Sequence, residues 1–212
     1  HKVPIPLVLF TWENLSPPNP IAQENLKRCA LVICGNQEAE PLVAPYAKKT
    51  FVQLQVGVDT VHFWQREVER TVKVAFIGRD AAEKGVDILR IAYPAAKILP
   101  WKPWLELPWW YSQCQIVVSF SQDTQVWREQ APNYVSCEAM ACGCAVVTSD
   151  AGSIKSWLSG CPGALVIGQH EWDNLSKMLQ ALSNDEARCL KLGAEGRQWV
   201  IDKFSIPVHA KE

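Results

Sequence analysis

The sequence predicts an α/β protein built on doubly wound parallel sheets. Apolar runs typical of strands alternate with helical patterns over almost the whole chain, and this alternation is typical of βαβ units. The strand-like runs are apolar on both faces, as in VKVAFIG, QIVVSFS and CAVVTSD, which indicates sheets covered by helices on each side. In such folds ligands bind beyond the carboxyl ends of the strands, so the residues that follow each strand are the first candidates for a site.

Two series of such elements follow one another, with a glycine turn at 57–63 between them. The first series predicts strands at 6–12, 30–34 and 50–59, and helices at 21–29 and 36–47, the latter with Asn36 as N-cap. The second predicts strands at 72–78, 96–100, 115–121, 144–150 and 163–168, with helices between and after them. We therefore expect part of one domain in residues 1–56, a junction in 57–71 and a nearly complete domain in 72–212.

Composition excludes several classes of protein. The 212 residues carry a formal net charge of −1 without blocks of like charge, which argues against nucleic acid as a partner because it requires a basic surface. Neither a membrane-spanning run of about 18 apolar residues nor a signal peptide is expected. The eight cysteines lie mostly in apolar elements and complete no zinc motif, so we expect a reducing, cytoplasmic setting that leaves room for peripheral contact with a membrane.

The first candidate site residues follow the first strand of the second series. In IGRDAAEKG, Gly78 ends the strand, Arg79 comes next and Lys84 stands at the start of a helix. A glycine turn, two cations and a helix N-terminus together favour an anion such as a diphosphate. The alternative is that Arg79 and Lys84 are solvated surface charges.

Two glutamates and a second glycine turn are the other candidates. Glu129 follows a strand and a polar loop, and Glu138 is expected in the first turn of a helix at 135–142. A carboxylate accepts hydrogen bonds from a sugar diol, so two acids and two cations on one rim suggest a nucleotide-sugar site. Taken singly, Glu129 is equally explained as a solvated loop acid and Glu138 as an acid favoured by the helix dipole. In SDAGS (149–153) the glycine permits close approach of a ligand, or simply serves a strand-to-helix turn.

Three stretches carry a resemblance to a known family: GVDTVHF at 57–63, IGRDAAEKG at 77–85 and EQAPNYVSCEAMACGCAVVTSDAGS at 129–153. With them the chain resembles the family-4 retaining glycosyltransferases, the group 1 glycosyl transferases of the GT-B type. The resemblance implies two Rossmann-like domains that face each other across a cleft. This chain would hold the C-terminal donor-binding domain and the tail of the N-terminal, acceptor-side domain. It further implies a nucleoside-diphosphate sugar as donor substrate and no metal or other cofactor.

Carried over residue by residue, the resemblance also assigns roles. Arg79 and Lys84 would bind the diphosphate and stabilise the charge on the leaving nucleotide. Glu138 would bond the ribose hydroxyls, and Glu129 would face the donor sugar at the reacting end. The predicted catalytic residues are thus Glu129, Arg79 and Lys84, and the predicted donor-binding residues are Gly78, Arg79, Lys84, Asn133, Tyr134, Val135 and Glu138.

The chain departs from the family pattern in three places. The loop between Glu129 and Glu138 is one residue longer than the pattern, so Gln130 is the alternative occupant of the first acidic position. Between Gly85 and Trp110 one strand–helix unit is missing, and the second sheet is expected to be one strand short. In the first series the early strands, the glycine-rich loop and the histidine that faces the sugar are absent.

Functions of different kinds stay open at this stage. The leading hypothesis is a retaining transferase that moves a sugar to a hydroxyl of an acceptor, which is itself a sugar, a lipid or a small molecule. The alternative is a non-catalytic nucleotide-sugar-binding module, or the donor-binding subunit of a heteromer. Its partner chain or missing N-terminal domain would meet exposed tryptophans in WKPWLELPWW (101–110), although core packing also explains them. A nucleotide-sugar epimerase is a third interpretation, which EAMACG disfavours.

Overall fold

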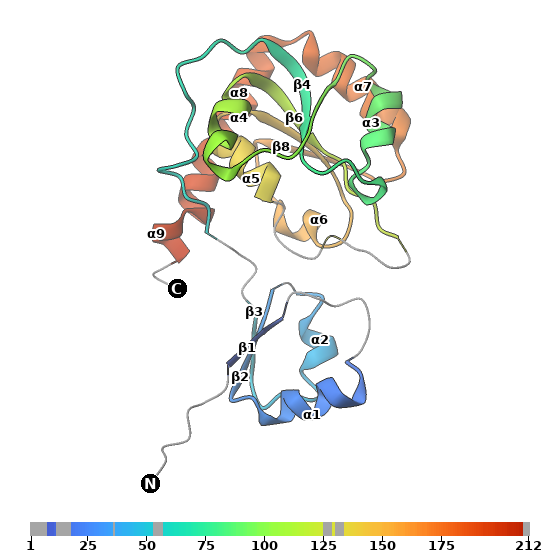
Figure 1. Ribbon diagram of the computed structural model, residues 1–212, viewed down its shortest axis with the longest axis vertical. Helices are drawn as coiled ribbons and strands as arrows, with labels where there is room; N and C mark the ends of the chain where they lie inside the picture. Colours follow the sequence, from blue (N-terminus) through green and yellow to red (C-terminus); the bar gives the residue numbers. More distant parts are fainter. Residues whose placement is uncertain are drawn as a thin grey trace.

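The computed structural model describes residues 8–11, 18–35, 37–52, 57–124, 129 and 134–209. These residues form two separate sheets, and every neighbouring pair of strands in both is parallel (Figure 1). The chain is therefore an α/β protein with doubly wound parallel sheets, as the alternation of strands and helices predicted.

The first sheet has three strands in the order β1-β2-β3. They are β1 (Val8–Thr11), β2 (Leu31–Cys34) and β3 (Thr50–Val52), connected by α1 (Pro20–Arg28) and α2 (Glu40–Val43). The helices pack on one face, where Val32 and Cys34 are fully buried. Asn19 caps α1 as its side chain accepts a hydrogen bond from the N–H of Ala22 at 2.9 Å.

The prediction for α2 was partly wrong. This helix is four residues long and its N-cap residue is Ala39. Asn36, the predicted cap, lies outside the described residues, as do residues 53–56 of the predicted third strand.

The second sheet has five strands in the order β5-β4-β6-β7-β8. They are β4 (Val72–Ile77), β5 (Lys97–Leu99), β6 (Cys114–Ser119), β7 (Ala145–Ser149) and β8 (Ala164–Ile167). Four of them fall within runs that the sequence predicted as strands, and β6 begins one residue before the predicted run at 115–121. All residues of β7 are buried, and this explains why AVVTS lacks the alternation of a half-exposed strand.

Helices cover both faces of the second sheet and enclose one core on each (Figure 1). One face carries α3 (Val86–Ala92) and α7 (Trp172–Ser183), and the other carries α4 (Leu107–Ser112), α5 (Tyr134–Ala141) and α8 (Glu186–Phe204). Short helices complete the unit: η1 (Ala82–Lys84), η2 (Trp104–Glu106), α6 (Ile154–Trp157) and α9 (Ile206–His209).

The strand order reverses between β4 and β6. From β4 the chain first moves outward to β5 and then returns to β6 on the other side, where Val74 pairs with Ile116. Such a reversal leaves a crevice beyond the carboxyl ends of the two central strands, and ligands of doubly wound sheets bind there. The residues that follow Ile77 and Ser119 are therefore placed at a ligand-binding edge.

The segment that contains GVDTVHF packs on the second unit. Val58 and Phe63 are buried in its core, and the N–H of Val58 donates to the carbonyl of Phe204 at 2.6 Å. Val58 also forms an isolated parallel bridge with Ser205, just after α8. The boundary near residue 56 stays a prediction, because residues 53–56 are not described.

The tryptophan-rich segment lies largely on the surface. Trp101, Trp104 and Trp109 have exposed fractions of 72%, 47% and 46%. Trp104 stacks on His62 with ring centroids 3.7 Å apart, so this surface continues onto the 57–63 segment. Core packing, one of the two explanations for these tryptophans, is therefore wrong for three of the four.

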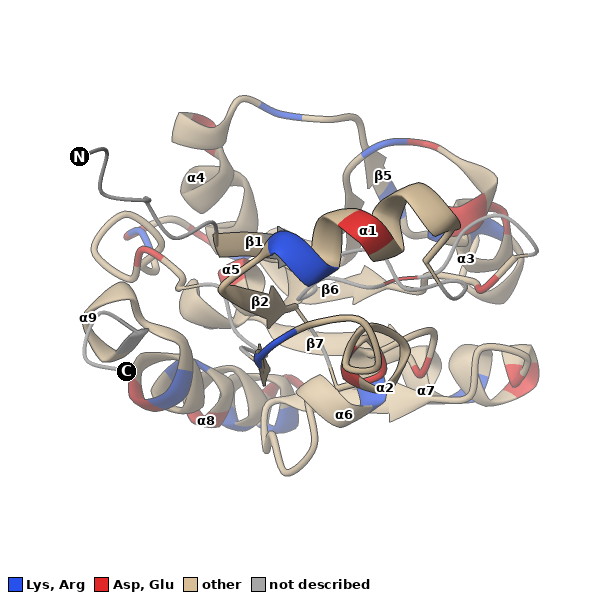
Figure 2. Cartoon of the chain, turned by 90° about the horizontal axis from the view of Figure 1, so that it is seen from below, with Lys and Arg blue, Asp and Glu red and all other residues tan. Residues whose placement is uncertain are grey.

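The surface charges are mixed in sign. Figure 2 shows basic and acidic residues on the same helices, as on α1 and α8, in agreement with the net charge of −1. Within the described part of the chain, no helix combines the length and apolar character needed to cross a membrane.

All eight cysteines are free and buried, as expected of small hydrophobic residues, and burial raises the pKa of Cys144 to about 11.

Gly85 tests how tightly η1 is held on the sheet. Both Gly85 and Gly160 have positive φ, 66° and 75°, but a Cβ at Gly85 would lie 2.0 Å from the carbonyl oxygen of Phe120, whereas Gly160 has open space. We expect Gly160→Ala to lower the free energy of unfolding by about 1 kcal/mol, from the left-handed conformation alone. We expect Gly85→Ala to lower it by about 3 kcal/mol, because the clash adds to that cost. Urea denaturation of both variants measures the difference, and equal losses would contradict the close packing.

Candidate functional site

The candidate site lies at the carboxyl edge of the second sheet, where β4 and β6 end. Gly78 and Arg79 follow β4, η1 carries Lys84, and Ser121 follows β6. The η1 turn is fixed to the loop after β6, because the N–H of Gln122 donates to the carbonyl of Glu83 at 2.9 Å. Gly85 fits this close approach because it lacks a Cβ and adopts positive φ.

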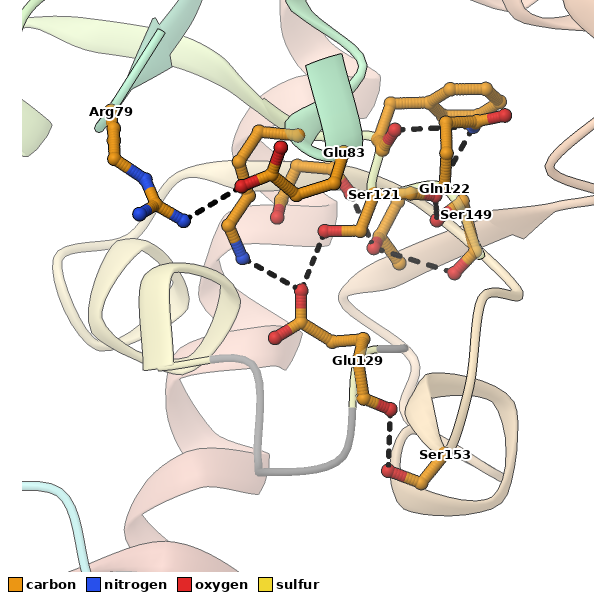
Figure 3. Close-up of polar contacts among 11 residues, drawn as sticks. Arg79, Glu83, Ser121, Gln122, Glu129, Ser149 and Ser153 are labelled. Atoms are coloured by element: carbon orange, nitrogen blue, oxygen red, sulfur yellow. Dashed lines mark hydrogen bonds and ion pairs between the residues drawn. The ribbon is translucent and has the colours of Figure 1, made fainter. Parts of the chain in front are cut away.

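Lys84 and Glu129 meet at this edge, and Figure 3 shows Glu129 beside Ser121. The Nζ of Lys84 lies 2.9 Å from Oε2 of Glu129, and the hydroxyl of Ser121 donates to the same oxygen at 2.6 Å. The side chains of Lys84 and Glu129 are only 27% and 13% exposed, so solvent screens their attraction less than it screens a surface ion pair. Neither Lys84 nor Glu129 is therefore a solvated charge on the protein surface.

The main chain of Glu129 is held by the SDAGS turn. Its carbonyl accepts from the N–H of Ser153 at 2.9 Å and from the Ser153 hydroxyl at 3.3 Å. A Cβ at Gly152, with φ at 53°, would lie 1.9 Å from the same oxygen. The close approach that Gly152 permits is thus to the backbone of Glu129, which anchors this acid in the loop.

Arg79 is less enclosed than Lys84. Its guanidinium donates to Oε1 of Glu83 at 2.8 Å, four residues on, and its side chain is 67% exposed (Figure 3). The contact is a surface ion pair within one turn, and such pairs contribute little stability. Arg79 stands beside the crevice and its long side chain is free of the core, whereas Lys84 is already held in place.

Glu138 occupies a different environment. It was expected in the first turn of a helix, but α5 begins at Tyr134 and no acid lies in its first turn, so this expectation was wrong. The helix dipole is strongest in the first turn and therefore gives a weaker explanation for Glu138. The side chain is half-buried, and one carboxylate oxygen accepts a hydrogen bond from the hydroxyl of Tyr111 at 3.2 Å.

Burial decides the ionisation of Glu138. It raises the pKa of this carboxyl to about 7, and the hydrogen bond from Tyr111 opposes the rise. Glu138 thus changes its charge close to neutral pH, and perturbed groups of this kind are common at functional sites.

The remaining predicted donor-binding residues lie at the start of α5. Tyr134 is exposed and Val135 half-buried, both in the first turn, while Asn133 and Gln130 lie outside the described residues. Within the described ranges, no three His, Cys, Asp or Glu side chains come close enough to hold a metal ion. The absence of a cofactor stays a prediction.

Sequence analysis missed three residues of this edge: Ser121, Tyr111 and Ser153. Ser121 was within reach, because it ends the run QIVVSFS and so stands at the same rim as the cations. Tyr111 belongs to a helix that packs behind the site, and no local pattern pairs it with Glu138. The role of Ser153 depends on where the loop that carries Glu129 returns to the sheet.

A comparison with models of protein families shows to which family the chain belongs. A family model described as glycosyl transferase-like matches residues 59–211, which include every described residue of the candidate site. The chain belongs to this glycosyl transferase-like family. Comparison with curated protein sequences gave no significant match.

Solved glycosyl transferase structures share the fold. A sucrose-phosphate synthase from Thermosynechococcus elongatus matches with a TM-score of 0.73 and 18% identity over 90% of this chain and 58% of that one. Anabaena HepE, solved with UDP and glucose, matches with a TM-score of 0.75 and 17% identity over 97% and 69%. The C-terminal domain of LpcC, a group 1 family protein from Francisella tularensis, matches with a TM-score of 0.60 and 20% identity over 71% and 100%. The chain therefore spans 58% and 69% of the first two structures.

The buried carboxyl of Glu138 predicts a pH-dependent stability. The folded pKa of about 7 lies above the ordinary value of 4.5, so the protonated acid favours the fold. This contribution is fully present below pH 4.5 and is lost as the pH rises through about 7. Glu138→Gln cannot ionise, so its stability relative to the natural chain should rise by about 2 kcal/mol from pH 4 to pH 8.

Thermal or urea unfolding at several pH values measures this change. The control is Glu195→Gln, which removes an acid from the exposed surface of α8 and should show no such trend. A difference between Glu138→Gln and the natural chain that stays constant with pH would contradict burial as the cause of the raised pKa.

Proposed function

We propose that this protein transfers a sugar from a nucleoside-diphosphate sugar to an acceptor hydroxyl with retention of the anomeric configuration. The observation that carries the proposal is the Lys84–Glu129 contact at the β4/β6 edge of a chain that belongs to a glycosyl transferase-like family. The edge is where doubly wound sheets bind ligands, and it presents cations and acids together.

In this proposal the cations act on the leaving group. The bond between the anomeric carbon and the diphosphate oxygen breaks, and its electron pair goes to the diphosphate. Lys84 and Arg79 stabilise the negative charge that builds there. The acceptor oxygen forms its new bond on the same face of the sugar, and its proton passes to the departing diphosphate.

The acids hold the sugars. Glu138 accepts hydrogen bonds from the ribose hydroxyls, and Glu129 faces the transferred sugar. The contact of Glu129 with Lys84 and Ser121 supports Glu129, rather than Gln130, as the residue at the reacting end. Backbone N–H groups of Asn133, Tyr134 and Val135 would add to the phosphate site.

The alternative is a module that binds the donor without turnover, or a donor-binding subunit. The exposed tryptophans favour it, since Trp101, Trp104 and Trp109 present apolar surface that a partner chain would cover. Both functions require the donor site and differ in whether the sugar is transferred.

Removal of Lys84 tests the donor site. Lys84→Ala should weaken the binding of a nucleoside diphosphate at least tenfold, because a charge-assisted contact to phosphate is lost. Lys191→Ala, which removes a lysine that is 74% exposed on α8, should bind normally. Calorimetry with UDP, GDP and ADP measures the affinities, and UDP is the first choice because the HepE structure contains it. If the natural chain binds none of the three, the donor site is wrong.

Turnover separates the two functions. With a labelled nucleotide sugar, transfer or slow release of the sugar should fall about 100-fold in Glu129→Gln, while affinity for the diphosphate should not weaken. Glu195→Gln on α8 is the matched control. Binding without any turnover in the natural chain would favour the non-catalytic module, and turnover that depends on Gln130 instead would reassign the acidic position.

A further inference from the structure

Tyr111 is a buried residue beside the candidate site with no role assigned so far. Its ring is 1% exposed, in α4, and packs near Phe63 with ring centroids 6.3 Å apart. Its main-chain carbonyl accepts a hydrogen bond from the thiol of Cys144 at 3.1 Å. Ring and backbone are thus held by the core, which fixes the direction in which the hydroxyl points.

That hydroxyl points at Glu138. It lies 3.2 Å from Oε2, and among the described residues it supplies the only side-chain hydrogen bond to this carboxylate. One oxygen of Glu138 is thus engaged by α4, and the residue is half-buried rather than fully buried. A residue that holds a ligand-binding group by a hydrogen bond in this way fixes the orientation of that group.

The other titratable groups near Glu138 do not supply a charge. Tyr134, Cys137 and Cys142, all from α5 or the turn after it, influence or are influenced by Glu138. Burial raises the pKa of each of these groups, and that of Tyr111, so all four are neutral near pH 7. Within the described residues no cation forms an ion pair with Glu138, in contrast to Glu129, which has Lys84.

We propose that Tyr111 is a positioning residue that holds the Glu138 carboxylate, through its buried hydroxyl, in the orientation and ionised form that accept hydrogen bonds from the donor ribose. The inference rests on the proposed function, because it uses Glu138 as the ribose acid. Without the hydroxyl, the half-buried carboxylate loses its donor and takes up a proton more readily, and a protonated acid is a poorer acceptor for two hydroxyls.

Tyr111→Phe is the direct test. It keeps the ring and the main-chain carbonyl, so the packing of α4 is retained. Binding of UDP, or of whichever of UDP, GDP and ADP the natural chain binds best, should weaken about tenfold at pH 7. The loss should shrink at alkaline pH, where Glu138 ionises even without its hydrogen bond. Tyr93→Phe, a half-buried tyrosine after α3 on the other face of the sheet, should leave the affinity unchanged at both pH values.

A double variant separates positioning from a general structural effect. If Tyr111 acts through Glu138, then Tyr111→Phe should cause no further loss of affinity in a Glu138→Gln background. The inference would be overturned if Tyr111→Phe weakened affinity in the Glu138→Gln background as much as it does in the natural chain. It would also be overturned if the loss of affinity in Tyr111→Phe did not depend on pH. Affinity of Tyr111→Phe equal to that of the natural chain at pH 7 would overturn it as well.

The ionisation of Glu138 can also be followed without a nucleotide. An infrared titration of the carboxyl band, taken as the difference between the natural chain and Glu138→Gln, should give a midpoint that moves upward in a Tyr111→Phe background. An unmoved midpoint would contradict the role of the hydroxyl. If the proposed function itself is wrong, the result is different: the natural chain binds no nucleoside diphosphate at all.

Discussion

The close approach of η1 to the end of β6 is the constraint on which the site depends. Gly85 brings this turn against the carbonyl of Phe120, and the hydrogen bond from Gln122 to Glu83 fixes it there. As a result Lys84, which follows β4 in the chain, lies at the end of β6, where it contacts Glu129. A side chain at Gly85 would lift the turn, and the charge of Lys84 would move away from the crevice. Sheet order and one glycine together determine where the cation stands.

Much of the fold could be predicted from the sequence, because it depends on local signals. The five strands of the second unit read as apolar runs, and each was found in the structure. The placement of Glu138 was less accurate because helix ends are hard to predict to the residue, and α5 begins at Tyr134, one residue before the predicted start. The exposure of Trp101 and Trp104 was equally undecidable, because an apolar residue does not reveal whether a neighbour covers it.

The contacts of the site were harder to predict than its location. The rim was predictable because all strands are parallel and their carboxyl ends share an edge. That Lys84 pairs with Glu129 while Arg79 pairs with Glu83 is not visible in the spacing, since Glu83 is close to both cations in the chain and Glu129 is distant from both. The difference arises from tertiary packing: η1 turns Lys84 inward over β6 and leaves Arg79 at the surface. Likewise the sequence left open whether Gly152 gives space to a ligand or serves a strand-to-helix turn, and in the structure it receives the backbone of Glu129.

The two glutamates of the site have different kinds of partner, and the difference affects how a ligand would bind. Glu129 contacts a cation and a hydroxyl, while half-buried Glu138 contacts only a neutral hydroxyl among the described side chains and has a pKa raised to about 7. A diphosphate that approaches Lys84 competes with Glu129 for the same ammonium group, so binding must exchange one anionic partner for another. A ribose that approaches Glu138 replaces no ion pair and instead adds donors to a carboxylate that lacks them, which favours its ionised form. Under the proposed function, the phosphate side of the site would supply selectivity for charge, whereas the ribose side would couple affinity to pH.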